Sequence, residues 1–309
     1  MRPVTLQEPF RAVFYAPFYA ALARGAYAAE GVEVQLLPGD APAAVKDAVL
    51  SGAADFGWGG PMRLLLAHDA DPGCPLRLFG AVVMRDPFFL VGRDPNPGFA
   101  LADLARLRLG TVSEVPTPWW TLQDDIRRAG LDPARVERVS DQGMATNLAA
   151  VRAGRLDAAQ VFEPFVSLAE RDGGGHVWHI AALRGPTSYT AFYARRDRIA
   201  ELRAEFSAVV RGLAATLEWL HAVPAAEVAE TVAGFFPDLD TDLLARCVER
   251  YRGLELWTRT PRFPPEALAR LEAAVLSAGA IRRSPGFAGL VEEGLTEAAL
   301  GGSVAKLGG

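Results

Sequence analysis

The sequence predicts an α/β fold with two lobes, each a mainly parallel sheet flanked by helices, and a C-terminal helical tail that packs on lobe one. Two observations predict this fold. Strand and helix patterns alternate over residues 10–91 and again over residues 107–194, and only helical patterns follow from residue 197 onward. An alternating order of strands and helices is typical of parallel sheets with right-handed crossovers.

The first alternating set begins at residues 10–14, which are apolar except for Arg11 and predict a strand. Pro17 suits the first turn of a helix that would run to Glu30, and Gly31 supplies the left-handed residue at which such helices end. Residues 32–37 alternate between apolar and polar side chains, which predicts a second strand. The remaining elements of this set are a helix at residues 40–51, a strand at residues 54–58 and a helix after Pro61.

The second set repeats this order. Two expected strands, residues 76–84 and 88–91, lead into it. Its own expected strands are residues 107–112, 136–139, 156–162, 176–180 and 188–194, and its expected helices are residues 118–129 and 145–153. We therefore assign residues 1–84 to the first part of lobe one. Residues 85–190 form lobe two, and residues 191–309 form the second part of lobe one with the helical tail.

The composition excludes several classes of protein. Half of the 309 residues are apolar, and 32 basic against 37 acidic residues give a formal net charge of −5. A nucleic-acid partner is not expected, because such proteins gather Lys and Arg on one face. Cys74 and Cys247 lie far apart and outside any Cys/His cluster, so we expect no zinc site. One bridge between them stays open, but two buried thiols fit better.

Targeting signals in the sequence are weak. Residues 12–23 are mostly apolar and end in Ala-Leu-Ala, as a secretory signal does, but Pro17 and tyrosines interrupt them. No stretch approaches the roughly 20 apolar residues of a membrane span. We expect a soluble chain without a convincing export signal.

Four segments carry a resemblance to a known superfamily. They are residues 15–34 (YAPFYAALARGAYAAEGVEV), 48–57 (AVLSGAADFG), 148–159 (LAAVRAGRLDAA) and 161–165 (VFEPF). In this order they resemble the type II periplasmic binding proteins, in the branch that binds sulfonates, nitrate and thiamine-pyrimidine precursors. The helical tail matches only in general character.

The resemblance implies the solute-binding protein of an ABC-type importer, a monomer with a membrane permease as partner. Two lobes would close as a hinge about chain crossings near residues 83–90 and 189–193, around a ligand at the carboxyl ends of strands. The protein would be periplasmic or extracytoplasmic if a leader has been removed, and cytoplasmic if Met1 is the native start.

Strand-end loops supply the expected ligand-binding residues. In lobe one these are Tyr15, Phe18, Asp40, Trp58, Gly59 and Gly60, and in lobe two they are Ser113, Pro116, Trp119, Gly143 and Glu163, with Tyr189 at the second crossing. Aromatic faces suit a flat ring, and the two glycines permit a ligand to approach closely. Burial in the core explains Trp58 about as well. At most one of Trp119 and Trp120 can face a ligand, because neighbours on a helix point apart.

Glu163 follows an apolar strand and precedes Pro164, where a strand becomes a helix. A carboxylate there can cap free N–H groups, which is also the first interpretation of Asp40. In the thiamine-precursor branch, however, an acidic residue at the matching point contacts the ligand. This favours a small aromatic or heterocyclic, pyrimidine-like ligand. Alternatively, the free N–H groups after Ser113 would receive a sulfonate or another small anion.

An enzymatic role is the competing interpretation. Fungal thiamine-pyrimidine synthases share this fold and as a family use pyridoxal phosphate with a lysine, a histidine and a cysteine-rich iron site. The resemblance aligns these features with Gly59, Arg63 and residues 185–189, and none of them is present here. Lys46, which could supply an amine, lies one element earlier. We therefore expect no catalytic residue, no metal and no cofactor, with a cytoplasmic sensor or an enzyme on the same scaffold as the alternative.

Overall fold

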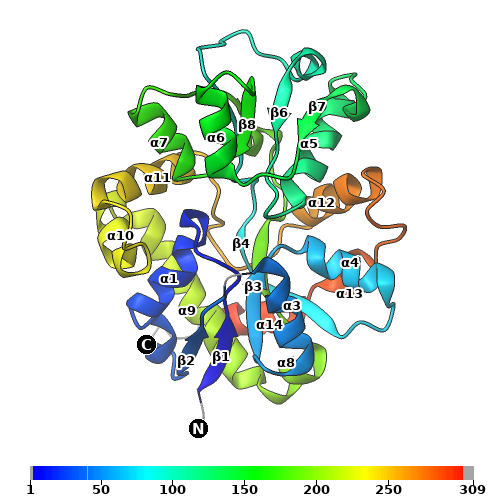
Figure 1. Cartoon of the computed structure of the whole chain (residues 1–309). Coiled ribbons are helices and arrows are strands. Elements are labelled where there is room, and N and C mark those ends of the chain that lie inside the picture. Colours follow the sequence, from blue (N-terminus) through cyan, green and yellow to red (C-terminus); the bar gives the residue numbers. More distant parts are fainter. Residues whose placement is uncertain (1–2, 40, 302–309) are drawn as a thin grey trace. The chain divides into compact units, whose positions relative to one another are not determined.

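The computed structural model describes residues 3–39 and 41–301, which form two compact units (Figure 1). Unit 1 holds the described residues up to Arg85, those of Pro186–Glu272 and those from Ile281 onward. Unit 2 holds Asp86–Gly185 and Ala273–Ala280. The main segment of unit 2 therefore ends at Gly185, a few residues before the lobe boundary at residue 190 that the sequence analysis expected. A short segment of the C-terminal tail, Ala273–Ala280, also belongs to unit 2.

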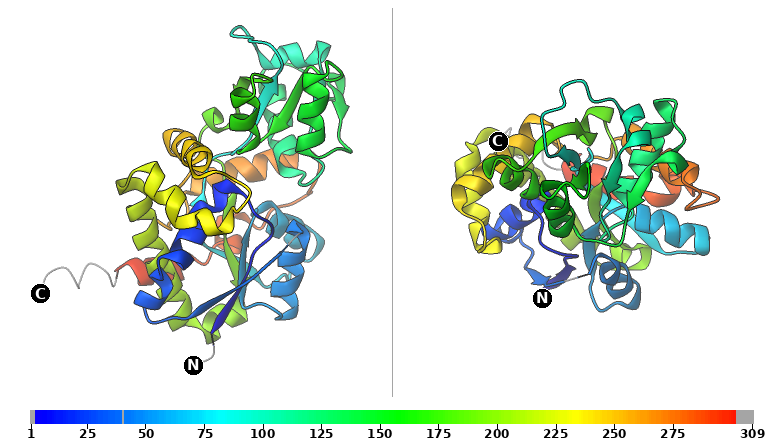
Figure 2. Two further views of the ribbon diagram at one scale, coloured as in Figure 1. Left: turned by 60° about the vertical axis from the view of Figure 1, so that its left-hand side comes forward. Right: turned by 45° about the horizontal axis from the view of Figure 1, so that its top comes forward.

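Unit 1 is built on a five-stranded sheet in the order β2-β1-β3-β10-β4. The parallel strands are β1 (Val4–Gln7), β2 (Val34–Leu37) and β3 (Phe56–Gly59), and β10 (Thr190–Arg195) runs antiparallel to both β3 and β4 (Leu76–Val83). Every residue of β3 and β4 is buried. Such complete burial requires cover on both faces of the sheet, and Figure 2 shows helices on both sides of it.

The helices of unit 1 begin and end where the local sequence favours it. Gly25 adopts a φ of 64° and separates α1 (Ala16–Ala23) from α2 (Ala26–Ala29), because glycine tolerates the left-handed region. The other helices that lie wholly in this unit are α3 (Pro42–Ser51), α4 (Met62–Ala70), α8 (Arg196–Glu201), α9 (Arg203–Ala222), α10 (Ala225–Val232), α11 (Thr241–Gly253), α13 (Gly286–Leu290) and α14 (Glu293–Gly301). Helix α12 (Pro265–Ser277) begins in unit 1 and ends in residues assigned to unit 2.

The helical tail packs on unit 1, as the sequence predicted. The longest tail helix, α9, contacts α1, α2 and α14. Phe206 of α9 lies 5.3 Å from Phe56 of β3 and 5.2 Å from Phe79 of β4, measured between ring centroids. The tail therefore completes the core of unit 1.

Unit 2 contains a second five-stranded sheet, in the order β7-β6-β8-β5-β9. The parallel strands are β6 (Arg108–Gly110), β7 (Glu137–Val139) and β8 (Ala158–Val161), and β5 (Phe89–Gly92) runs antiparallel to both β8 and β9 (His176–Ile180). Its α-helices are α5 (Thr117–Arg128), α6 (Met144–Arg152) and α7 (Phe165–Arg171). Each sheet is thus mixed: three neighbouring strands run parallel, the next strand is antiparallel to them, and a fifth strand pairs antiparallel with that one.

Two elements near the amino terminus differ from the sequence prediction. Residues 10–14 form no strand; the chain is irregular to Ala12 and enters a 3-10 turn, Val13–Tyr15. The first strand is instead β1, which the sequence analysis missed because its four residues, VTLQ, are half polar. The left-handed glycines expected at helix ends are confirmed, with φ of 86° at Gly31 and 80° at Gly52.

Both cysteines, Cys74 and Cys247, are free and buried, as expected from their spacing. Within residues 3–39 and 41–301, no helix has the length and apolar character needed to cross a membrane.

Candidate functional site

The carboxyl end of β3 lies at the expected ligand-binding end of the unit 1 sheet. Here Trp58 and Gly59 end the strand, Gly60 follows, and the Arg63 N–H donates to the Gly60 carbonyl at 3.0 Å as α4 begins. A Cβ placed on Gly59 would come 3.4 Å from the Tyr193 ring, and one on Gly60 would come 3.6 Å from the Tyr189 carbonyl oxygen. These are ordinary contact distances, so the described neighbours do not themselves require glycine at either position.

The aromatic residues expected here mostly pack against one another. Phe18 and Trp58 are fully buried and stack with ring centroids 4.7 Å apart and planes 3° apart. Tyr15 meets Trp58 edge-on at 5.8 Å, and Tyr189 meets Phe14 edge-on at 6.3 Å. The stacked pair belongs to the core, whereas Tyr15 and Tyr189 lie at its edge with 4% and 7% of their surface exposed.

Two polar side chains at this strand end, those of Tyr193 and Arg63, lack hydrogen-bond or ion-pair partners among the described residues. The Tyr193 side chain is fully buried, and its hydroxyl has no hydrogen-bond partner among the described residues. Arg63 is half-buried and forms no ion pair with any residue in the described ranges. Burial raises the pKa of Tyr15 and of Tyr193, and the charge of Arg63 is the largest influence in the opposite direction for both. The Arg63 guanidinium, which has no ion-pair partner in the described part of the chain, therefore interacts electrostatically with two buried phenols here.

The carboxyl end of β1 carries an acidic group that the sequence analysis missed with the strand itself. Glu8 is 1% exposed, and its carboxylate accepts hydrogen bonds from Arg11 Nε and Tyr19 Oη, each at 3.0 Å. Arg11 therefore balances the charge of Glu8, whereas Arg63 has no paired carboxylate within residues 3–39 and 41–301.

In unit 2, the loop before α5 and the loop before α6 come together, as expected for neighbouring parallel strands. Ser113 and Pro116 lie in the first loop and Gly143 in the second. Glu114, which was not anticipated, accepts a hydrogen bond from the Met144 N–H at 3.1 Å, and a Cβ on Gly143 would come 2.9 Å from its Oε1. A carboxylate thus already lies at the amino end of α6, where an anionic ligand would meet like charge.

Trp119 packs against the hydrophobic core of unit 2, around Leu109, Leu122 and Ile126. The Arg138 guanidinium lies 4.7 Å from its ring centroid. The ring of Trp119 therefore has neighbours on the side of β7. Asp40, the remaining expected ligand residue, lies outside the described residues.

Glu163 is fully buried just after β8. Its Oε2 accepts a hydrogen bond from the Ser167 N–H at 2.9 Å, and its Oε1 accepts one from the Ser167 hydroxyl at 2.8 Å. Ser167 lies in the first turn of α7. These contacts are the ones a helix-capping carboxylate makes.

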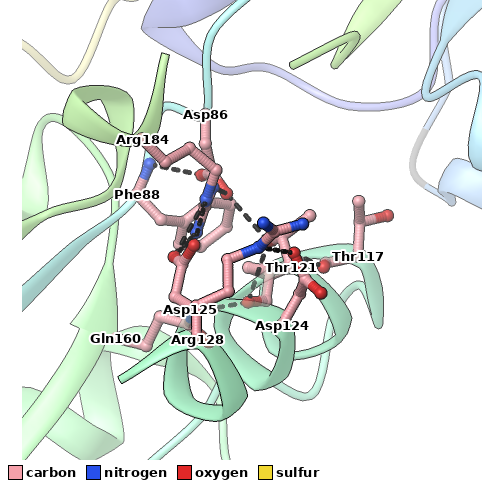
Figure 3. Close-up of polar contacts among 10 residues, drawn as sticks. Asp86, Phe88, Thr117, Thr121, Asp124, Asp125, Arg128, Gln160 and Arg184 are labelled. Carbon is pink, nitrogen blue, oxygen red and sulfur yellow. Dashed lines mark hydrogen bonds and ion pairs between the residues drawn. The ribbon is translucent and has the colours of Figure 1, made fainter. Parts of the chain in front are cut away.

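A buried ionic network, which the sequence analysis missed, joins both ends of the main segment of unit 2 (Figure 3). Arg184, near the end of that segment, pairs with Asp86, its first residue, and with Asp125 of α5. Asp86 also accepts hydrogen bonds from the Thr121 hydroxyl at 2.9 Å and the Phe88 N–H at 3.0 Å. Burial alone would lower the pKa of Arg184, but the two carboxylates outweigh it and raise that pKa. Within unit 2, the network holds α5 against the two ends of the segment Asp86–Gly185.

Among the described residues, no group of three or more His, Cys, Asp or Glu side chains is arranged to hold a metal ion. Cys247 lies in α11 and Cys74 before β4, so neither thiol is at the carboxyl end of β3.

Comparison with known proteins gives matches along most of the chain. YtlA of Bacillus subtilis (strain 168), whose name gives it a binding role and no ligand, is 21% identical over 298 residues, which cover 95% of this chain and 89% of YtlA. The periplasmic aliphatic sulphonate binding protein SsuA of Escherichia coli superposes with a TM-score of 0.74 at 17% identity, covering 92% of this chain and 95% of SsuA. The desulfurization enzyme DszB superposes with a TM-score of 0.71 at 15% identity, covering 97% and 99%.

These similarities in structure confirm the type II periplasmic-binding-protein fold, which hosts both a binding protein and an enzyme. The sequence model described as "NMT1/THI5 like" matches residues 14–227, which is more than half of the chain. The chain therefore belongs to the NMT1/THI5-like family.

Proposed function

We propose that this protein is the solute-binding component of an ABC-type importer and that it carries a small aromatic or heterocyclic molecule to a membrane permease. The proposal rests mainly on the carboxyl end of β3, where Tyr15, Gly59, Gly60 and Tyr189 gather beside incompletely matched polar groups. Open α/β sheets bind ligands at this end of their strands. The names of YtlA and SsuA, a binding protein and a sulphonate-binding protein, support the same role.

An enzymatic function has less support. The family resemblance would place a lysine at Gly59 and a histidine at Arg63, and neither side chain is there. The two thiols are buried in other parts of unit 1, away from the strand end. Covalent catalysis needs an accessible nucleophile with a base beside it, so binding without chemistry fits these residues better.

A sulfonate or another small anion is the second candidate ligand, in place of a neutral heterocycle. The observation in its favour is the half-buried guanidinium of Arg63, which forms no ion pair with any described residue, since carboxylates, sulfonates and phosphates bind arginine through charge-assisted hydrogen bonds. Closure of the two lobes on the ligand stays a prediction of the family resemblance.

The proposal is tested by a thermal-shift screen of the purified protein against pyrimidines, thiamine precursors, aromatic carboxylates, sulfonates and nitrate. A ligand at 100 times its dissociation constant stabilises the folded state by about 2.7 kcal/mol, so binding of one class should give a selective rise in the unfolding temperature. Mass spectrometry after incubation should recover that compound unchanged. Consumption of the compound would establish an enzyme instead, and no shift with any class would contradict the proposal.

A further inference from the structure

We propose a second ligand site in unit 1, a hollow beside the two chain crossings that binds a small amphipathic anion, a carboxylate or phosphate on an apolar body. The hollow has a volume of about 300 Å³, and all of its lining residues belong to unit 1. Among them, Arg85 ends the first segment of this unit and Pro186 begins the next. The residues gathered at the carboxyl end of β3 do not line it, so the inference is independent of the proposed solute site.

The walls of the hollow are largely apolar. Met84, Pro186, Trp257 and Pro264 contribute to them. The chain is fixed here by pairing between segments far apart in the sequence, since the Met84 N–H donates to the Leu256 carbonyl at 3.0 Å. Ligand pockets are usually preformed, mostly apolar and about 300–1,000 Å³ in volume, so the hollow suits a small molecule with an apolar body.

The charged side chains around the hollow are mostly basic, in a chain that is acidic overall. Arg85, Arg252 and Arg259 line it against Glu255, whereas the net charge of the chain is −5. Arg259 is exposed and forms no ion pair with any described residue, so its guanidinium N–H groups are available to a ligand. A carboxylate or a phosphate can accept two of them at once. We therefore assign the anionic group of the ligand to Arg259.

The edge of the hollow carries a strained backbone. Glu255 has a φ of 50° and is the single residue other than glycine with a positive φ in the described part of the chain. It follows α11 at the position where glycine usually ends a helix, and its Oε2 accepts a hydrogen bond from Arg85 at 2.8 Å. Strain of this kind is typical of ligand clamps and switch segments. The strained turn brings a carboxylate to Arg85, where it competes with an anionic ligand for the guanidinium.

Calorimetry with two matched pairs of probes, hexanoate with hexanamide and phenyl phosphate with phenol, tests the site. Arg259→Gln should weaken binding of the anionic probes about tenfold, the effect of one charge-assisted hydrogen bond. Glu255→Gln removes the competing carboxylate from Arg85 and should strengthen their binding several-fold. The controls Arg246→Gln and Glu293→Gln make the same changes of charge at exposed positions of unit 1 outside the hollow, and they should leave binding unchanged.

The outcomes separate this site from the solute site. If the wild-type protein binds neither anionic probe, if the neutral partners bind as tightly, or if Arg259→Gln and Glu255→Gln behave as their controls do, the inference is wrong. A solute found by the thermal-shift screen should, at saturating concentration, leave hexanoate binding in place, and displacement would assign the probe to the solute site instead. If Arg259→Gln does not fold, Glu255→Gln still decides, because only a ligand in this hollow gains affinity from that change. Failure of the screen leaves all of these measurements valid.

Discussion

At Glu163, the hydrogen bonds to Ser167 favour a structural role that can be measured separately from ligand binding. Both carboxylate oxygens accept hydrogen bonds from Ser167, one from its N–H and one from its hydroxyl. In Glu163→Gln the amide oxygen can still accept from the Ser167 N–H, and the NH₂ can donate to the Ser167 hydroxyl, so the variant removes only the charge from these two hydrogen bonds. A hydrogen bond to a charged group contributes about 1 kcal/mol more than a neutral one, so we expect the free energy of unfolding to fall by about 1–2 kcal/mol in urea titrations.

The control for this variant is Glu137→Gln. Glu137 lies in the same unit and pairs with Arg108 at an exposed position, where an ion pair contributes about 0–1 kcal/mol. A Glu163→Gln protein of unchanged stability but weakened ligand binding would contradict the capping role and assign the carboxylate to the ligand.

Arg63 illustrates what could not be predicted at the residue scale. An arginine in the first turn after two strand-end glycines is visible in the sequence, and it could have been considered as a ligand residue. Its significance depends on the absence of a paired carboxylate among the described residues, which only the folded arrangement shows. Phe18 and Trp58 are the converse case, because nothing in the spacing of the two residues showed that their rings would stack on each other.

At the scale of single elements, α5 carries two adjacent aspartates whose arginine partners differ in burial (Figure 3). Asp125 is 11% exposed and pairs with Arg184, which is 8% exposed, whereas Asp124 is 14% exposed and pairs with Arg128, which is 61% exposed. Breaking a buried ion pair by removing one partner costs about 3–5 kcal/mol, whereas a helical surface pair contributes about 0.3–0.5 kcal/mol. We therefore expect Asp125→Asn to destabilise the protein strongly and Asp124→Asn hardly at all.

Chemical denaturation of the two variants tests this expectation. Because Asp125 and Asp124 are neighbours on one helix, the comparison holds helix propensity and sequence position nearly constant. Equal stability of the two variants would show that the Arg184 network contributes little, and that α5 is positioned by its apolar face alone.

Sequence patterns predicted most elements because the strands are apolar and glycine ends several helices. Gly31 and Gly52 both adopt left-handed backbone conformations at the expected places. The strand prediction failed at the amino terminus, where the strand is short and its composition is not apolar. β1 is only four residues long and half polar, while Ala12, Val13 and Phe14 are buried without forming a strand. Burial, rather than strand pairing, explains that apolar run.

At the scale of the whole molecule, the two units repeat one sheet plan. In each, three parallel strands are followed by an antiparallel strand and then by one further strand, in the orders β2-β1-β3-β10-β4 and β7-β6-β8-β5-β9. The repetition of strand and helix patterns in the sequence predicted this similarity. The charge of the strand-end residues could not be predicted in the same way. In unit 1 the half-buried Arg63 forms no ion pair with any described residue, and in unit 2 carboxylates lie at the starts of α6 and α7.

The stability of the protein should depend on pH through one buried histidine, His68, and two partly buried ones, His179 and His221. Burial lowers the pKa of His68, His179 and His221, while the unfolded chain keeps a histidine pKa of about 6.5. Below that value the unfolded state binds more protons than the folded state, so the free energy of unfolding falls as pH decreases. The loss begins near pH 7 and continues until the folded histidines are themselves protonated.

Urea titrations at pH 7.5, 6.5 and 5.5 measure this dependence. Lowered carboxyl pKa values, as at Asp103 and Asp197, act in a separate window, since the stability they contribute is lost only as pH falls below about 4. His179→Gln removes the histidine whose Nε2 is buried without a hydrogen-bond partner in the described chain, and it should flatten the curve between pH 7.5 and 5.5. A stability that stays constant across that interval in the wild-type protein would mean that all three rings become protonated without unfolding, and that their burial is relieved by local motion.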